Sequence, residues 1–220
     1  MKFMIQIVIS IFAMFLLSGC TQKSSDIRST LTEAFWGFDD INLSKESVEN
    51  LPYASSYFRI NHGQQIFMVL AFVEENTINK NIRLKWLSSD SSMIVTENGR
   101  VVKTLNLPDV NLTAIHSTNP QNHFNESHYF WSTIYNWQPG YQFNFQAKIE
   151  TKRLKEETLT SLLWRENVIQ WQEKIVFEGL KKSMHSTYWT DKNGQVLKSA
   201  QWVVPDKLFI EQEILKPYKG

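Results

Sequence analysis

The chain has 220 residues, of which 42% are hydrophobic and 20% charged, and it contains 8 Gly and 6 Pro. This composition excludes a collagen-like, disordered or low-complexity chain, and the length suits one domain with a single core. The 23 basic and 22 acidic residues give a net charge of +1, so the general positive charge used in nucleic-acid binding is missing. Cys20 is the only cysteine, which excludes an internal disulfide and a cysteine-based metal site.

The N-terminus has the layout of a secretory signal. Lys2 precedes an apolar run from Phe3 to Leu17, and small residues follow the run. A membrane-spanning helix is the alternative, but it needs about 20 apolar residues and this run is shorter. We therefore expect residues 1–19 to be a signal peptide that is removed on export.

The segment Leu17-Ser18-Gly19-Cys20 resembles the bacterial lipobox, whose cysteine receives a diacylglyceryl group and becomes the first mature residue. An ordinary thiol is the alternative, but the position of Cys20 favours lipidation, with diacylglycerol and palmitate as the attached groups. Each buried CH₂ contributes about 0.8 kcal/mol, so two or three acyl chains make a lasting anchor. By resemblance to enterobacterial lipoproteins, Thr21 instead of Asp predicts sorting to the outer membrane, with the protein body on the periplasmic side.

After the anchor, residues 20–25 are predicted to be a polar tether and residues 26–220 a single β-rich domain. The domain is expected to begin with a helix from Asp26 to Trp36, and a second short helix is predicted from Ser44 to Asn50, before Pro52. One face of the first helix is apolar and carries Ile27, Leu31, Ala34 and Phe35.

Most of the remaining chain has the patterns of β-strands. From Tyr141 to Glu150 apolar and polar residues alternate without exception, as in a strand with one buried face. Ile82 to Trp86 alternates in the same way, whereas Ile66 to Val73 is a continuous apolar run that predicts a strand covered on both faces. The other predicted strands are Ala54 to Ile60, Met93 to Glu97, Arg100 to Leu105, Val168 to Glu178, His185 to Thr190, Gln195 to Val204 and Leu208 to Leu215.

Turn signals separate these strands. Asn98-Gly99 and Asn193-Gly194 are the residue pairs that favour tight β-hairpins, because both residue types tolerate positive φ. Pro139-Gly140 is a third turn, and Asn119 to Ser127 is expected to be a surface loop. About a dozen short strands at this spacing predict an antiparallel sandwich or barrel.

Several segments resemble one known family, the YjbF/GfcB lipoproteins. They are Leu51 to Ser55, Met68 to Ala71, Trp86, Val95 to Thr104, Tyr135 to Tyr141, Gly194 to Gln201 and Lys216 to Tyr218. The resemblance implies an outer-membrane lipoprotein encoded with machinery for the Yjb exopolysaccharide or the group 4 capsule. It also implies a mostly antiparallel, half-open barrel, and the family offers no established catalytic motif.

Aromatic residues are the main candidates for a binding site. The rings of Trp86, Phe143 and Phe145 are expected to pack in the core. A second group surrounds the Pro139-Gly140 turn and could form a platform for sugar rings, because amphipathic rings offer an apolar face beside hydrogen-bonding groups. These candidate glycan-binding residues are Trp131, Tyr135, Trp137 and Tyr141.

Signs of catalytic chemistry are weak. His116, His123 and His128 could supply three zinc ligands, but their spacing fits no known pattern, and loop positions in solvent are the simpler interpretation. A Gly-x-Ser-x-Gly elbow, a Walker A loop and a Rossmann glycine pattern are missing from the sequence. We therefore expect no enzymatic activity, metal or cofactor.

The resulting prediction is a lipid-anchored accessory protein for exopolysaccharide or capsule production or export, which binds without catalysing a reaction. Its expected partners are the outer membrane, through the anchor, and the polysaccharide or other export proteins. Two alternatives remain open. One is a glycan-binding module with an exposed aromatic row, and the other is a carrier of acyl or lipid-linked ligands. The carrier requires an open barrel cavity lined by Phe143, Phe145 and residues 66–73.

Overall fold

The computed structural model of the chain describes residues 40–117, 124–140 and 142–220. The predicted signal peptide, Cys20, the tether and the helix from Asp26 to Trp36 lie outside these residues, as do His123 and Tyr141. The second predicted helix is confirmed as α3 (Lys45–Glu49), and the Ser44 side chain caps it by accepting a hydrogen bond of 3.1 Å from the Ser47 N–H.

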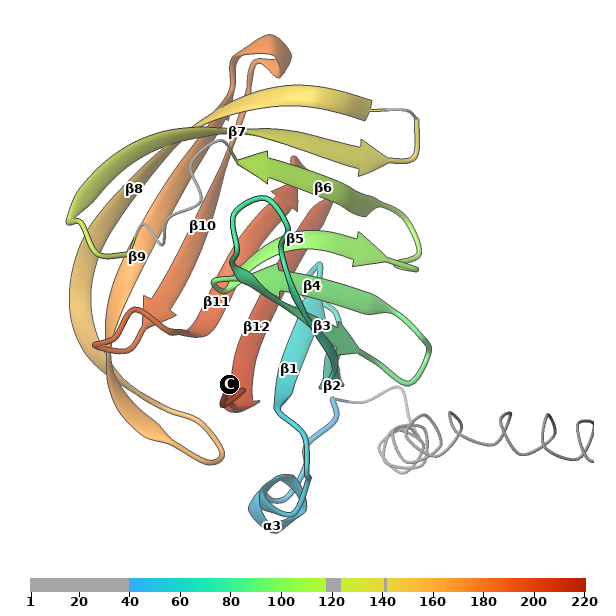
Figure 1. Cartoon of the computed structure of the whole chain (residues 1–220), viewed down its shortest axis with the longest axis vertical. Coiled ribbons are helices and arrows are strands. Elements are labelled where there is room, and N and C mark those ends of the chain that lie inside the picture. Colours follow the sequence, from blue (N-terminus) through green and yellow to red (C-terminus); the bar gives the residue numbers. More distant parts are fainter. Residues whose placement is uncertain (1–39, 118–123, 141) are drawn as a thin grey trace, which may run out of the picture. The chain divides into compact units, whose positions relative to one another are not determined.

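Twelve antiparallel strands form one sheet that rolls into a nearly closed barrel (Figure 1). The order across the sheet is β5-β4-β3-β2-β1-β12-β11-β10-β9-β8-β7-β6, so most neighbours are consecutive in the chain. The prediction of a mainly β, antiparallel, barrel-like fold is therefore confirmed. The strands are β1 (Ser55–Ile60), β2 (Gln65–Glu75), β3 (Ile82–Leu87), β4 (Met93–Glu97), β5 (Arg100–Leu105), β6 (Asn111–Ser117), β7 (His128–Gln138), β8 (Gln142–Thr160), β9 (Arg165–Phe177), β10 (Lys182–Thr190), β11 (Val196–Val204) and β12 (Leu208–Lys216).

The barrel closes where its two edge strands, β5 and β6, approach each other (Figure 1). Side chains connect them: the Thr104 hydroxyl donates to Asn111 Oδ1 at 3.1 Å and accepts from the Leu112 N–H at 2.9 Å. Asn111 also accepts a hydrogen bond from the Leu107 N–H at 3.1 Å. These contacts occupy polar groups that an open sheet edge would leave unpaired.

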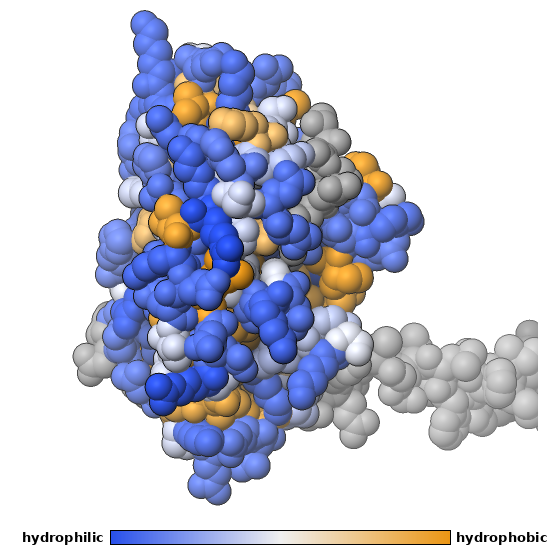
Figure 2. All heavy atoms as spheres, turned by 90° about the vertical axis from the view of Figure 1, so that its left-hand side faces the viewer, coloured by the Kyte–Doolittle hydropathy of each residue, from blue (hydrophilic) through white to orange (hydrophobic). Residues whose placement is uncertain are grey.

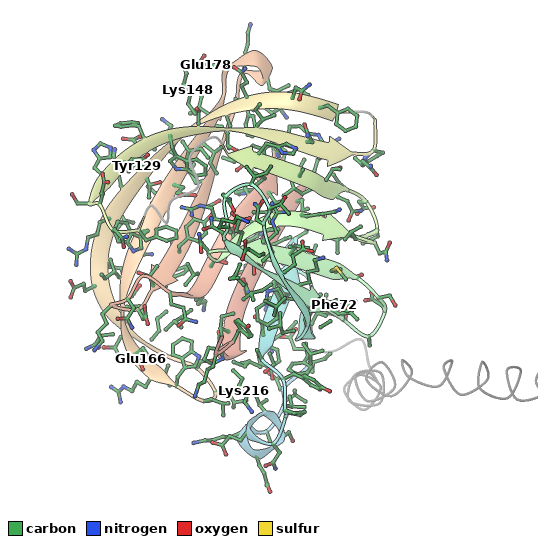
Figure 3. All side chains as sticks on the ribbon, viewed as in Figure 1. Phe72, Tyr129, Lys148, Glu166, Glu178 and Lys216 are labelled. Carbon is green, nitrogen blue, oxygen red and sulfur yellow. The ribbon has the colours of Figure 1, made fainter. Side chains whose placement is uncertain are left out.

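The segment around α3 covers the outer face of β1 and β2. The Tyr57 hydroxyl accepts a hydrogen bond of 2.8 Å from the Leu43 N–H, and the Tyr57 and Phe67 rings meet at 6.1 Å. Phe67, Met68, Val69 and Leu70 are all buried, which confirms that the centre of β2 is covered on both faces. The end of the predicted run differs, because Phe72 and Val73 are exposed beyond this cover (Figure 3).

The hairpin between β4 and β5 has the predicted turn, with φ of 50° at Asn98 and 76° at Gly99. The β10–β11 hairpin is also present, but its loop is longer than a two-residue turn and only Gly194 of the Asn-Gly pair has a positive φ. The Asp191 carboxylate holds this loop by accepting from the N–H groups of Asn193 and Gln195 at 2.9 and 2.8 Å. Local side-chain bonding by Asp thus replaces the tight turn.

The prediction that Phe143 packs in the core is wrong. Asn144 has a φ of 61° and its N–H bonds to the Asn136 side chain at 2.7 Å, and the β7–β8 register shifts between Tyr135 and Trp137. This irregularity breaks the alternation that the sequence shows, so Phe143 is 46% exposed while Ala147 and Ile149 stay inside. Trp86 is fully buried and Phe145 packs against the core, as expected.

One side of the outer surface is mainly polar. On the side that faces the viewer in Figure 2, hydrophobic atoms form separate small spots on a hydrophilic surface. Within the part of the chain that the structure describes, none of the helices has the length and hydrophobicity needed to cross a bilayer. The inward side chains fill much of the barrel, and a polar region interrupts this packing (Figure 3).

Candidate functional site

A buried ion pair lies inside the barrel. Arg100, the first residue of β5, donates from Nη2 to Glu173 Oε1 of β9 at 2.5 Å, and the two side chains are only 12% and 2% exposed. The Thr151 hydroxyl of β8 donates to the same carboxylate oxygen at 3.0 Å. Removing two charges from water is costly, so a buried pair is weak evidence for a stabilising role. The buried pair is therefore a candidate functional group.

Aromatic rings surround the Arg100 guanidinium. Its Cζ atom lies 4.5 Å from the ring centre of Phe124, 5.2 Å from that of Trp131 and 5.4 Å from that of Tyr188. Cation–π contacts contribute about 2 kcal/mol or more each when they are desolvated. The rings therefore hold the guanidinium in place and shield the ion pair from water.

The surroundings keep these groups in one protonation state. Burial alone would lower the pKa of Arg100, but attraction to Glu173 outweighs it and the pKa is raised. Burial, and then the charge of Glu173, raises the pKa of Tyr135 and of Tyr188. Both tyrosines consequently remain neutral hydroxyl donors, and Arg100 remains a cation, at neutral pH.

Gln201 of β11 connects this cluster to the β4–β5 hairpin. Its Oε1 accepts from the Val101 N–H at 3.0 Å and from the Tyr188 hydroxyl at 3.2 Å. Its Nε2 donates to the Gly99 carbonyl at 2.9 Å and to Ser199 Oγ at 2.8 Å. All four hydrogen-bonding positions of this buried amide are used, which fixes the hairpin and Arg100 relative to the barrel wall.

A cavity of about 110 Å³ lies beside the ion pair. Two of its buried polar atoms, Ser186 Oγ and Arg100 Nε, have no hydrogen-bond partner among residues 40–117, 124–140 and 142–220. Side chains from eight strands and from the β2–β3 loop line it, among them Asn79, Trp131, Tyr135, Glu173, Tyr188 and Gln201.

The β2–β3 loop is held at the rim of this cavity by Glu97. Its carboxylate accepts hydrogen bonds from the side chains of Asn76, Asn79, Asn81 and Arg83 at 2.6–3.0 Å. Burial favours the neutral acid, but these donors outweigh it and lower the pKa of Glu97. Glu97 is buried, although its place beside the hairpin turn suggests a surface residue from sequence alone.

The candidate glycan-binding residues that the structure describes do not form an exposed platform. Tyr135 and Trp137 point into the barrel and are 5% and 6% exposed, because they share the inward phase of β7, and Trp137 stacks on Phe145 at 4.4 Å. Trp131 lies half-buried at the cavity, where its Nε1 donates to Thr151 at 3.2 Å. Tyr141 lies outside the described residues.

Of the three candidate histidines, the structure describes His116, which lies at the cavity, and His128, which does not line it. His116 is an exposed residue of β6, and His128 is the first residue of β7, where its Nε2 lies 2.8 Å from Glu150 Oε1. Groups of three or more metal-ligating side chains do not occur in the regions that the structure describes.

The cavity predicted for an acyl or lipid-linked ligand is not present in the expected form. Phe67 to Leu70 are packed and Phe143 is exposed, so these residues do not line an open interior. Phe145 borders a separate hollow of about 520 Å³ near the connection between β9 and β10, with Ala147, Phe177 and Leu180. The same wall contains Gln146, Lys148 and Glu178, and Lys148 pairs with Glu178 at 2.7 Å (Figure 3).

The sequence contains a signal for the ion pair, but only a partial one. In β9, Trp171, Glu173, Ile175 and Phe177 occupy alternate positions, so a carboxylate stands in a buried, apolar phase. Such a residue needs a partner. Nothing in the local pattern identifies Arg100, which lies 73 residues away in the chain.

Comparisons with known proteins agree with this fold. A family model described as "Group 4 capsule polysaccharide lipoprotein gfcB, YjbF" matches residues 28–215. The uncharacterized lipoprotein GfcB of Escherichia coli K12 is 30% identical over 218 residues, covering 96% of this chain and 98% of GfcB. The uncharacterized lipoprotein YjbF of the same strain is 26% identical over 209 residues, covering 93% and 94%.

Among solved structures, the crystal structure of the hypothetical lipoprotein YmcC from Escherichia coli K12 superposes with a TM-score of 0.76 at 26% sequence identity. The superposition covers 92% of this chain and 99% of that chain. The family match and the coverage of GfcB both extend over nearly the whole described barrel. The chain therefore belongs to the YjbF family of group 4 capsule polysaccharide lipoproteins.

Proposed function

We propose that this protein is an outer-membrane lipoprotein that assists the production or export of a capsule or exopolysaccharide by binding, without catalysing a reaction. The observation that carries the proposal is the family match over residues 28–215, since the family is described by its link to the group 4 capsule polysaccharide. The lipobox-like segment ending at Cys20 supports the anchor, because it combines an apolar run with a cysteine directly after small residues.

The interior site supports binding as the mode of action. Its groups are preorganised: Glu173 is held by Arg100 and Thr151, and Gln201 is saturated with hydrogen bonds. Rigid polar groups beside aromatic surfaces are typical of ligand sites. Arg100, Tyr135 and Tyr188 have raised pKa values, so they keep their protons at neutral pH, which suits hydrogen-bond donors better than general acids or bases.

A deletion strain tests the proposal. We expect deletion of the gene to reduce the surface polysaccharide, measured by extraction and uronic acid or hexose assay, and the wild-type gene to restore it. A gene carrying Arg100→Met together with Glu173→Met should express a folded protein that fails to restore the polysaccharide, since this double variant replaces the polar site with apolar side chains.

Two outcomes would contradict this account. Unchanged surface polysaccharide in the deletion strain would remove the pathway assignment. Full restoration by the double variant would remove the interior site from the function. Circular dichroism of the purified double variant serves as the folding control.

A further inference from the structure

We infer that the cavity beside Arg100 and Glu173 binds a single neutral sugar unit. The inference deepens the proposed function and rests on it, since it names the class of ligand that the interior site would take. Three properties of the cavity lead to this ligand: its unused polar groups, its balanced charge and its size.

The first property is unused hydrogen-bonding capacity. Ser186 is 1% exposed and lines the cavity, yet its Oγ has no partner within the described part of the chain. Arg100 also lines the cavity, and its Nε is likewise without a partner there. A buried polar atom without a hydrogen bond costs about 1–3 kcal/mol. A ligand that both accepts from Arg100 and bonds with Ser186 recovers this cost, and a sugar hydroxyl can donate and accept.

The second property is charge. The charged residues of the wall form two pairs, Arg100 with Glu173 at 2.5 Å and Arg83 with Glu97 at 2.8 Å. The pairs leave no excess of positive charge for an anion and no excess of negative charge for a cation. Because an unpaired charge is costly to bury, the occupant that fits is polar but uncharged.

The third property is size and surface. The cavity measures about 110 Å³, several times the roughly 10–15 Å³ that one water molecule requires. The half-buried ring of Trp131 and the ring of Tyr188 form part of the wall, beside the Asn79 and Asn98 side chains. A sugar ring has apolar C–H faces and a polar rim, so it matches a wall that combines rings and amides.

Titration calorimetry tests the inference on the full chain, purified in lauryldimethylamine oxide, a detergent without a sugar headgroup. The probes are glucose, galactose, N-acetylglucosamine and oligosaccharides released from the surface polysaccharide of the producing strain, and glucuronate tests the preference for a neutral ligand. We expect at least one neutral probe to bind with a Kd of about 1 mM or tighter, and glucuronate to bind more weakly.

Ser186→Ala should weaken that binding about fivefold, the loss of one hydrogen bond. The variant should keep or raise the melting temperature, because the wild-type hydroxyl has no partner to lose. Ser183→Ala, an exposed position on the same strand, is the matched control and should bind as the wild type does.

Three results would overturn the inference: no binding of any neutral probe, equal binding by Ser186→Ala, or tighter binding of glucuronate. These failures are distinguishable from failure of the proposed function. If the sugars do not bind but the deletion strain lacks its polysaccharide, the ligand class is wrong and the accessory role stands. If the polysaccharide is unaffected, the role itself is wrong.

Discussion

Arg100 and Glu173 depend on each other more than any other pair of side chains described above. Each charge is buried, and each is compensated by the other, by Thr151 or by aromatic rings. The double exchange to methionine keeps the volume approximately and removes both charges, whereas a single exchange leaves one buried charge without its partner. The energetic consequences of the two changes are therefore very different.

We predict that Arg100→Met lowers the free energy of unfolding by about 3–5 kcal/mol, because it leaves the Glu173 carboxylate buried and unpaired. Adding Glu173→Met should recover most of the loss. Urea denaturation of the three proteins measures both effects.

The control for this prediction is Arg153→Met, which removes one partner of an exposed pair with Glu156 and should change stability by about 0.5 kcal/mol or less. A similarly small effect of Arg100→Met would show that the interior pair is not the compensated, buried unit described here.

At the scale of elements, the β4–β5 hairpin carries Arg100 into the barrel and meets the β10–β11 hairpin there. A Cβ atom placed on Gly99 would lie 2.3 Å from the Val196 Cβ, and the φ of Gly99 is 76°. Two separate constraints therefore require glycine at this position: the backbone conformation and the close contact between the hairpins.

We predict that Gly99→Ala destabilises the protein by about 2–5 kcal/mol, the sum of a left-handed backbone cost and overpacking against Val196. Combining it with Val196→Ala should relieve the overpacking and leave the backbone cost. Thermal unfolding followed by circular dichroism measures both.

Gly179→Ala is the matched control, because nothing lies within 4 Å of its added Cβ. Equal melting temperatures for Gly99→Ala and Gly179→Ala would contradict the close approach of the two hairpins. A change at Gly99 should also weaken ligand binding, since the Gly99 carbonyl and the Val101 N–H both bond to Gln201.

For the whole molecule, the decisive question is whether the barrel is attached to a membrane. We predict that Cys20→Ser removes the protein from the outer-membrane fraction, because serine cannot form the thioether to the lipid. Sucrose-gradient fractionation followed by immunoblotting measures the distribution.

Ser24→Ala in the predicted tether is the control and should remain in the outer-membrane fraction. A Cys20→Ser protein that still sediments with the outer membrane would show that attachment does not require the lipid. The melting temperature of the barrel should be the same in both variants, since both positions precede the first strand in the chain.

Much of the fold could be predicted because strand alternation and turn preference are local properties. The strands around Asn98-Gly99 follow the sequence pattern, and the positive φ values at these two residues are those that the pair favours. The pattern of hydrophobic residues does not identify β6, β7 or the C-terminal half of β8. Residues 152–160 are mostly exposed on both faces, so the alternation of hydrophobic and polar residues is missing there. Antiparallel pairing with β9 keeps this segment in the sheet.

The candidate site could be predicted only in its parts. Trp131 and Tyr135, both predicted from their aromatic character, line the cavity, whereas Trp137 packs in the core. Alternation assigns a residue to one face of a strand, but it does not say whether that face meets solvent, packed side chains or a cavity. Closure of the barrel decides this, because it turns one face of every strand inward.

The one-dimensional pattern of residues thus specifies most of the strands, the first hairpin turn, the short helix and the lipobox-like segment, all of which depend on neighbours within a few positions. The pairing of Arg100 with Glu173, the cavity beside them and the exposure of Phe143 depend on strand register and on the meeting of β5 with β6. These features join residues far apart in the chain. They exist only after the sheet has rolled up and water has been excluded from its interior.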